Sequence, residues 1–354
     1  MKTKFLTIIY FSFFSITCFS QKNEIKSAEN EFKNGRFQQS INILNNAEYL
    51  IFNAEEADQS EFYNLKAKVL TGLFETNIEP SKNIALAIAA YQDLIAAEKA
   101  SGKFKYSVLA IEAIKKIKAD LLKSAIADIE AKRFSEGASK MHSIYLGNKK
   151  DTINLYYAAS YYKDAKDYTN AIKLYEELEM LKFSGKGLGY YAVNKETGVD
   201  QFFNSILSRD LSVKAGTHIK PRVEKLPSKR TEIYTNMAFI YLNKKDLDKS
   251  EWCNNKILEI NPKDPSAYLN LAYLKIDAKK IVMDEMSNLG TSAKDMKVYD
   301  ELIIKKDNLI IKAISYLEKG NVAIPNDQDI YKLLLNLYRA MDMTTQYNAL
   351  KARI

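Results

Sequence analysis

The chain has few of the residues that build metal sites and disulfides. Its 354 residues include only two cysteines and two histidines, and Cys18 lies in an N-terminal segment that we expect to be removed. No intramolecular disulfide is then possible, and the remaining Cys253 is expected to be a small buried hydrophobic residue. His142 and His218 are far apart, and no cluster has the spacing of zinc ligands. The sequence therefore predicts neither a metal site nor a cofactor.

Proline and glycine are also scarce. Only six prolines and twelve glycines interrupt the chain, while apolar residues recur at three- and four-residue spacing almost everywhere. That pattern predicts a nearly all-α protein. Signatures of catalysis are missing too, because no Gly-x-Ser-x-Gly elbow occurs and the glycine-rich segment 184–189 lacks the spacing of a phosphate-binding loop. We expect no catalytic residues and no enzymatic activity.

The first twenty residues have the pattern of an export signal. Lys2 and Lys4 precede an apolar run from Phe5 to Thr17, and small residues surround the expected cleavage site after Ser20. Removal of residues 1–20 leaves a mature chain whose formal charge falls from +8 to +6 with the loss of the two lysines. We expect this mature chain to be exported, to the periplasm.

Two alternatives for the N-terminus are weaker. A transmembrane anchor needs about 18 or more continuous apolar residues, and this run is shorter and interrupted by Thr7, Ser12 and Ser15. A lipid anchor on Cys18 usually requires a Leu and a small Gly or Ala before the cysteine, and residues 15–17 do not provide them. Since the rest of the sequence has no apolar run that could span a bilayer, we expect no transmembrane segment after signal removal.

A 34-residue self-similarity organises the helical part of the chain. Leu121, Ala125 and Phe134 return as Leu155, Ala159 and Tyr168, and Tyr234 and Ala238 return as Tyr268 and Ala272. Such a period is typical of stacked pairs of helices, since one pair cannot bury its apolar face alone. Stacking leaves a concave surface that is free to hold a partner. Residues 58–118 are helical by pattern but cannot be assigned to positions in the repeat.

The cleanest helix pair spans residues 155–178. Leu155, Ala158, Ala159 and Tyr162 share one helix face and should be buried. Lys132, Lys166 and Lys245 stand at the turns between paired helices, where only Gly35 retains a glycine. Since the many tyrosines of this pair cannot all share one stripe, Tyr156 or Tyr161 could line the concave side.

Proline marks the ends of two second helices, at Asn261-Pro262 and Ile324-Pro325. The repeat unit opened by Tyr268 is expected to be stretched by an extra segment near residues 283–296.

At these positions the chain resembles the tetratricopeptide repeat (TPR) family. The resemblance covers about two thirds of the mature chain and implies a right-handed α-solenoid of TPR-like helix pairs that mediates protein–protein interaction. The sequence departs from the family pattern where Ala159, Ala238 and Ala272 replace a frequent glycine. Alanine still permits close helix contact, but binding specificity known from other members does not carry over.

Residues 181–230 interrupt the repeats and separate helical segments 21–180 and 231–354. Two short apolar runs, 190–193 and 199–203, flank a turn that contains Gly198, so we expect one small β-hairpin insertion. The segment holds ten basic and four acidic residues, a net charge of +6, while the rest of the mature chain sums to zero. Pro221 and Pro227 favour an extended strap over residues 205–230.

The leading hypothesis is an exported scaffold that binds a protein or peptide through its concave groove and its basic insertion. The alternative is a module that binds an anionic polymer or a lipid headgroup through the strap. A nucleic-acid partner is not expected, because the protein is exported and its helical body has no net charge. The candidate contact residues are Tyr156, Tyr161, Tyr190, Tyr191, Phe202, Phe203, Lys214, His218, Lys220, Arg222 and Lys225.

Overall fold

The computed structural model describes residues 22–51, 54–203 and 206–352, so the expected export signal at 1–20 lies outside the described residues. The chain divides into two compact units, the first ending at Leu178 and the second beginning at Glu179. No helix among the described residues has the length and apolarity needed to cross a membrane.

The first unit is built of four successive helix pairs. Residues 22–33 pair with α2 (Phe37–Ile51), and α3 (Glu56–Glu75) pairs with α4 (Pro80–Ser101). They are followed by α5 (Ser107–Glu130) with α6 (Phe134–Gly147), and by α7 (Thr152–Asp164) with α8 (Tyr168–Met180). The segment that could not be assigned from sequence therefore forms α3, α4 and the first half of α5, which are longer than α7 and α8.

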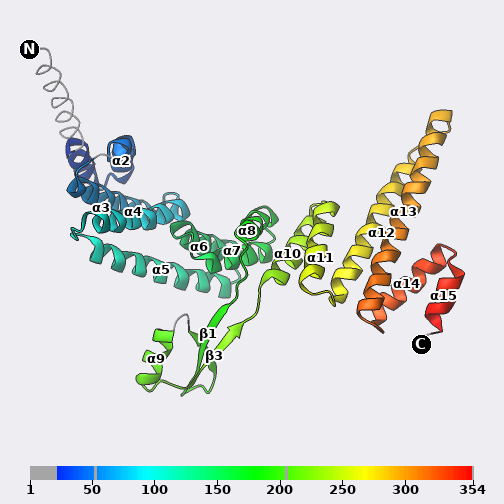
Figure 1. Cartoon of the computed structure of the whole chain (residues 1–354). Coiled ribbons are helices and arrows are strands. Elements are labelled where there is room, and N and C mark those ends of the chain that lie inside the picture. Colours follow the sequence, from blue (N-terminus) through cyan, green and yellow to red (C-terminus); the bar gives the residue numbers. More distant parts are fainter. Residues whose placement is uncertain (1–21, 52–53, 204–205, 353–354) are drawn as a thin grey trace, which may run out of the picture. The chain divides into compact units, whose positions relative to one another are not determined.

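Three further helix pairs form most of the second unit. They are α10 (Arg230–Asn243) with α11 (Leu247–Ile260), α12 (Pro265–Ser287) with α13 (Ala293–Ala323), and α14 (Gln328–Ala340) with α15 (Thr344–Lys351). Helices α11 and α13 end where the prolines predicted, with Asn261 and Ile324 as their C-caps. The stretched repeat unit is confirmed as the long antiparallel hairpin of α12 and α13, which lie side by side (Figure 1).

The turns between paired helices confirm the alignment of the repeat. Gly35, Lys132, Lys166 and Lys245 all have a positive φ, between 59° and 73°. Glycine adopts this conformation at little cost, whereas a side chain with a Cβ is strained there. The three lysines therefore occupy the turn position that a glycine would satisfy more easily.

The two helices of a pair meet closely at a repeated position. Ser40 Oγ donates a hydrogen bond of 2.7 Å to the carbonyl of Ala28, and Ser250 Oγ donates one of 3.0 Å to the carbonyl of Ala238. A Cβ on Gly137 would lie 3.0 Å from the carbonyl of Ala125, which stands at the corresponding place. A small residue twelve positions after each alanine therefore allows the second helix to approach the backbone of the first.

The predicted core stripe is confirmed, since Leu155, Ala158, Ala159 and Tyr162 are all buried. Cys253 is also buried, as expected of a small hydrophobic residue. The chain is thus an all-α repeat protein of TPR-like helix pairs with a small β insertion.

The insertion is larger than the expected hairpin. Strands β1 (Gly187–Asn194) and β2 (Asp200–Phe203) pair antiparallel with Tyr190 opposite Phe203, which confirms the hairpin. Residues 205–230 do not form one extended strap: α9 (Ile206–Lys214) follows β2, and β3 (His218–Leu226) adds a third strand beside β1. The sheet therefore has the strand order β2-β1-β3.

Pro221 fits this sheet because β3 is an edge strand. Proline has no backbone N–H to donate and is tolerated at sheet edges and bulges. Lys220 and Pro221 stand together opposite Ala192, where the register shifts, and Lys220 has a φ of +51°. The proline that suggested a strap instead marks a β-bulge. The insertion closes at its base, where Lys229 N donates a 2.7 Å hydrogen bond to the carbonyl of Ser184.

Candidate binding surfaces

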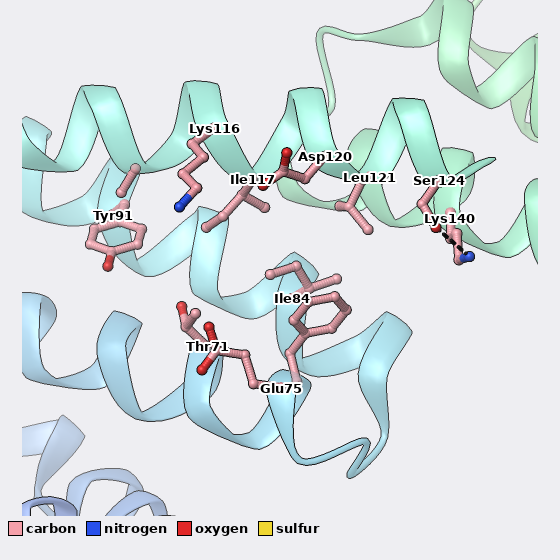
Figure 2. Close-up of a pocket in the computed structure, with 12 residues that line it drawn as sticks. Thr71, Glu75, Ile84, Tyr91, Lys116, Ile117, Asp120, Leu121, Ser124 and Lys140 are labelled. Carbon is pink, nitrogen blue, oxygen red and sulfur yellow. Dashed lines mark hydrogen bonds between the residues drawn. The ribbon is translucent and has the colours of Figure 1, made fainter. Parts of the chain in front are cut away.

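The first unit contains a groove between α3 and α5. A cavity of about 400 Å³ has an apolar floor formed by Phe74 of α3, Ile84 and Tyr91 of α4, and Ile117 and Leu121 of α5. Figure 2 shows the side chains of α5 facing those of α3 across this space, with the two α4 residues between them. A second cavity of about 650 Å³ shares several of these residues and extends the groove toward α6.

Charged side chains of both signs line the groove. Lys116 and Asp120 of α5 and Glu75 of α3 are exposed, and none of them has an ion-pair partner among the residues that the structure describes. The Lys116 ammonium and the Glu75 carboxylate both reach toward the cavity in Figure 2. An occupant of the groove could therefore form ion pairs with them without breaking existing ones.

Lys140 differs from these three residues because its charge is already compensated. Its ammonium donates to Ser124 Oγ at 2.7 Å and to the carboxylate of the buried Asp128. Hydrogen bonds from Lys140 and Arg133 hold the pKa of Asp128 below its usual range, so this carboxylate stays ionised. Lys140 belongs to the wall of the groove rather than to its open charges.

The end of the groove toward α6 carries hydroxyl groups. Ser81 and Ser139 are hydrogen bonded at 2.6 Å, and Ser135 and Ser143 also line this cavity. At the other end, burial raises the pKa of Tyr91, so its phenol remains neutral. The groove thus offers an apolar floor, a charged edge and neutral hydroxyl groups.

The groove was not among the sequence predictions. Its helices come from the segment that could not be assigned to repeat positions, and the tyrosines proposed to line a concave surface lie elsewhere. Tyr156 is buried, and Tyr161 is half-buried with its ring stacked on Phe134 at 6.3 Å. The one feature of the sequence that could have indicated the groove is the pair of charged residues Lys116 and Asp120 beside the apolar Ile117 and Leu121.

One face of the insertion's sheet is covered by α9 and forms a small core. Ala192, Phe203, Arg209 and His218 are buried there. His218 is hydrogen bonded through Nε2 to Gln201 Oε1 at 2.7 Å and through Nδ1 to Thr217 Oγ1 at 2.9 Å, and its ring meets Phe203 edge-on at 5.1 Å. Phe203 and His218 therefore support the insertion from inside.

The opposite face of the sheet is more open. Tyr191 contacts the exposed Phe202 at a ring distance of 5.4 Å, and the Arg222 guanidinium lies 4.8 Å from the Tyr191 ring. Arg222 also forms ion pairs with Asp200 and Glu224. These contacts leave the aromatic pair accessible but compensate the charge of Arg222.

The accessible positive charge of the insertion comes from lysines. Arg209 forms an ion pair with Asp210, and Arg222 forms ion pairs with Asp200 and Glu224. Arginines therefore neutralise three of the four acidic residues in segment 181–230. Six exposed lysines have no ion-pair partner in the part of the chain that the structure describes: Lys182, Lys186, Lys195, Lys214, Lys220 and Lys225. The described residues also contain no cluster of His, Cys, Asp and Glu arranged to hold a metal ion.

These features define a helical repeat protein of the TPR-like class with two open surfaces. No protein-family model and no curated protein matches the sequence. Solved structures with a similar helical arrangement include a TPR repeats protein from Bacteroides fragilis, which is 15% identical, with a TM-score of 0.34 and coverage of 78% of this chain and 98% of that one.

Two other similar structures have lower identities. PilF from Pseudomonas aeruginosa is 12% identical, with a TM-score of 0.32 and coverage of 95% of this chain and 91% of that one. A tetratricopeptide repeat protein from Parabacteroides merdae is 14% identical, with a TM-score of 0.25 and coverage of 90% and 98%. At these scores the similarities assign no partner to the chain, and the repeat architecture rests on the helix pairs described above.

Proposed function

We propose that this chain is a non-enzymatic scaffold that binds a protein or peptide segment through the groove between α3 and α5. The observation that carries the proposal is the combination of an apolar floor with three unpaired charges, those of Glu75, Lys116 and Asp120. An apolar side chain of the partner would cover Ile117, and its polar groups would pair with the groove's charges. Burial of the apolar surface would supply most of the affinity, and the charges would select the partner's orientation.

The groove is tested by reversing one charge and capturing partners. Lys116→Glu replaces a groove cation by an anion, and Lys115→Glu makes the same change one residue away on α5, outside the cavity. Proteins captured by the wild type and by both variants are compared by quantitative mass spectrometry. We expect a specific partner to fall at least five-fold with Lys116→Glu and to be retained by Lys115→Glu. Equal capture by the two variants would rule out this groove as the binding site.

The basic insertion supports a second candidate function, binding of an anionic polymer or surface. The observation in its favour is that its exposed lysines have no ion pairs, so an anionic partner would displace only counterions and water. Tyr191 and Phe202 would add ring contacts from the open face of the sheet, whereas Tyr190 lies on the covered face beside Arg209. Arg222 would act chiefly by holding Asp200 and Glu224, while Lys214, Lys220 and Lys225 would meet the partner directly.

Heparin, a sulfated polymer, is a suitable probe for this second candidate. Changing Lys214, Lys220 and Lys225 together to Gln should weaken heparin binding and flatten its dependence on NaCl concentration, because fewer charges remain to be screened. The matched control changes three exposed lysines of the same unit, Lys263, Lys294 and Lys297, to Gln. A similar loss in both triple variants would indicate an effect of net charge alone.

We also propose that the chain is exported, with residues 1–20 removed at the inner membrane. The order of basic, apolar and small-residue segments supports this location. Intact-mass measurement of the protein recovered from its native cells tests it. A mass that retains Met1, or one that includes a lipid on Cys18, would contradict the proposed processing.

A further inference from the structure

Helix α9 is oriented with three of its four apolar residues outward. The charged Arg209 is buried beneath it, where the guanidinium lies 5.8 Å from the Tyr190 ring and donates a 3.1 Å hydrogen bond to the carbonyl of Arg222. In contrast, Ile206, Leu207 and Leu211 are 50%, 66% and 58% exposed. A surface helix normally packs its apolar side against the body of the protein and turns its charges to solvent.

The outward side chains form one continuous surface. Leu207 and Leu211 are four residues apart, so they are neighbours on the helix, and Lys214 follows one turn later on the same side. All three are exposed. Because side chains on an exposed helix face point away from the helix axis, these three form a projecting surface rather than a pocket for a partner's side chain.

Lysines gather at the C-terminal end of this helix. Lys195 N donates a 2.9 Å hydrogen bond to the carbonyl of Thr217, which places the β1–β2 turn beside the turn that follows α9. Lys214 and Lys220 flank the same turn in sequence, and all three lysines are exposed without an ion pair among the described residues. The surface thus combines accessible apolar side chains with uncompensated positive charge.

We propose that this α9 surface, formed by Ile206, Leu207 and Leu211 with Lys195, Lys214 and Lys220, docks on a bilayer that contains anionic phospholipids. The proposal rests on the second candidate function and names the anionic surface. The leucines would enter the boundary between headgroups and acyl chains, while the lysines would contact lipid phosphates. At nine residues, α9 is too short to span the bilayer, so it would lie on the surface.

An acidic protein is the competing partner. It would have to supply a pocket shaped for the three apolar side chains as well as carboxylates placed for the lysines. A bilayer needs no such complementary shape, because its acyl chains adapt to any projecting apolar side chain. The projecting form of the α9 surface therefore favours lipid.

Vesicle flotation of the full chain tests the proposal. Vesicles contain either phosphatidylcholine alone or a mixture of phosphatidylglycerol and phosphatidylcholine. The test variant is Leu207→Ser/Leu211→Ser, and the control is Val108→Ser/Leu109→Ser, which changes two equally exposed apolar residues of α5. All proteins share one N-terminal sequence, so the apolar run 5–17 contributes equally to each.

We expect the wild type and the α5 control to bind the anionic vesicles equally and the α9 variant to bind at least ten-fold more weakly. Binding should also fall at least ten-fold on vesicles of phosphatidylcholine alone. The proposal is overturned if the wild type shows no preference for anionic vesicles or if the α9 variant binds them as well as the control.

Heparin binding by the α9 variant distinguishes failure of the bilayer proposal from failure of the second candidate function, on which that proposal rests. Retained heparin binding with no vesicle binding by any protein would reject the bilayer and leave the basic insertion as a site for a soluble or protein polyanion. If the α9 variant binds both heparin and anionic vesicles as well as the wild type does, Leu207 and Leu211 take no part in binding.

Discussion

The hydroxyl of Tyr316 donates a 2.7 Å hydrogen bond to Glu251 Oε1, joining α13 to α11 across consecutive helix pairs. The same kind of bond joins Tyr145 of α6 to Glu177 of α8 in the first unit. Several tyrosines are thus part of the repeat core and donate their hydroxyl to a carboxylate, as Tyr338 also does to Glu318. Within each unit, such bonds fix the spacing between successive helix pairs in addition to apolar packing.

Tyr316→Phe should therefore destabilise the protein by about 1 kcal/mol, the usual contribution of one hydrogen bond. The ring would still pack, so the loss reports the hydroxyl alone. Urea unfolding followed by circular dichroism measures it. The control, Tyr273→Phe, removes the hydroxyl of a tyrosine that is 51% exposed and should change stability by less than about 0.5 kcal/mol.

Glu251 should make the stability depend on pH in the acid range. Burial tends to raise the pKa of this carboxyl, but hydrogen bonds from Lys275 and Tyr316 outweigh that effect and lower it overall. Because the folded pKa lies below the unfolded one, the stabilisation is complete above the unfolded value and is lost as pH falls through the folded value. Glu251→Gln should remove this contribution and so flatten the decline of stability below about pH 4.5.

The control for this pH dependence is Glu301→Gln, which changes an exposed carboxylate of α13. Melting temperatures of the two variants and the wild type are measured between about pH 3 and pH 7. If the melting temperatures of Glu251→Gln and the wild type fall in parallel as pH decreases, Glu251 does not contribute to the acid dependence of stability.

Glu98 is expected to be essential for the start of α5. Its fully buried carboxylate accepts hydrogen bonds from Tyr106 N at 2.9 Å, Ser107 N at 2.8 Å and Ser107 Oγ at 2.6 Å. These groups have no other partner at a helix N-terminus. Glu98→Ala should cost about 2–3 kcal/mol in urea unfolding, whereas Glu112→Ala, which changes an exposed carboxylate of α5, should cost less than about 0.5 kcal/mol.

Ala159→Leu should destabilise the first unit, because Ala159 is fully buried and overpacking typically costs about 1–3 kcal/mol. Lys166→Ala should be nearly neutral. Lys166 is exposed with a φ of +61°, and alanine keeps the Cβ that causes strain there. Thermal unfolding distinguishes the two, and equal shifts would contradict the assigned alignment of the repeat.

Deletion of residues 186–226 with a short Gly/Ser bridge should leave the helix pairs folded. The hydrogen bond between Lys229 N and the Ser184 carbonyl closes the insertion at its base, so the bridge need only span adjacent ends. Far-ultraviolet circular dichroism should remain strongly helical, since each repeat contacts mainly its neighbours. Unfolding or aggregation of the deletion variant would make the sheet part of the core.

Local spacing in the sequence was sufficient for much of the fold. The spacing of apolar residues by three and four positions predicted the helices. The 34-residue self-similarity placed Lys132, Lys166 and Lys245 at equivalent turns, and all three have a positive φ in the structure. Two short apolar runs on either side of a turn with Gly198 predicted the β1–β2 hairpin. Each of these features depends on residues close in the chain, where backbone geometry determines which side chains share a face.

Tertiary packing decided the candidate surfaces. The groove exists because Phe74, Ile84 and Ile117, from three helices, line one cavity, and no local pattern reports that distance. Strand β3 pairs with β1, although β2 and α9 lie between them in the sequence. A hairpin pattern, which needs two neighbouring strands, could not predict this pairing. The sequence marks Leu207 and Leu211 as apolar, but only packing against the sheet determines that Arg209 is covered while they face outward. Burial depends on contacts between segments that are distant in the sequence. Short-range spacing shows which side chains share a face of a helix or strand, but it does not show which other segment, if any, packs against that face.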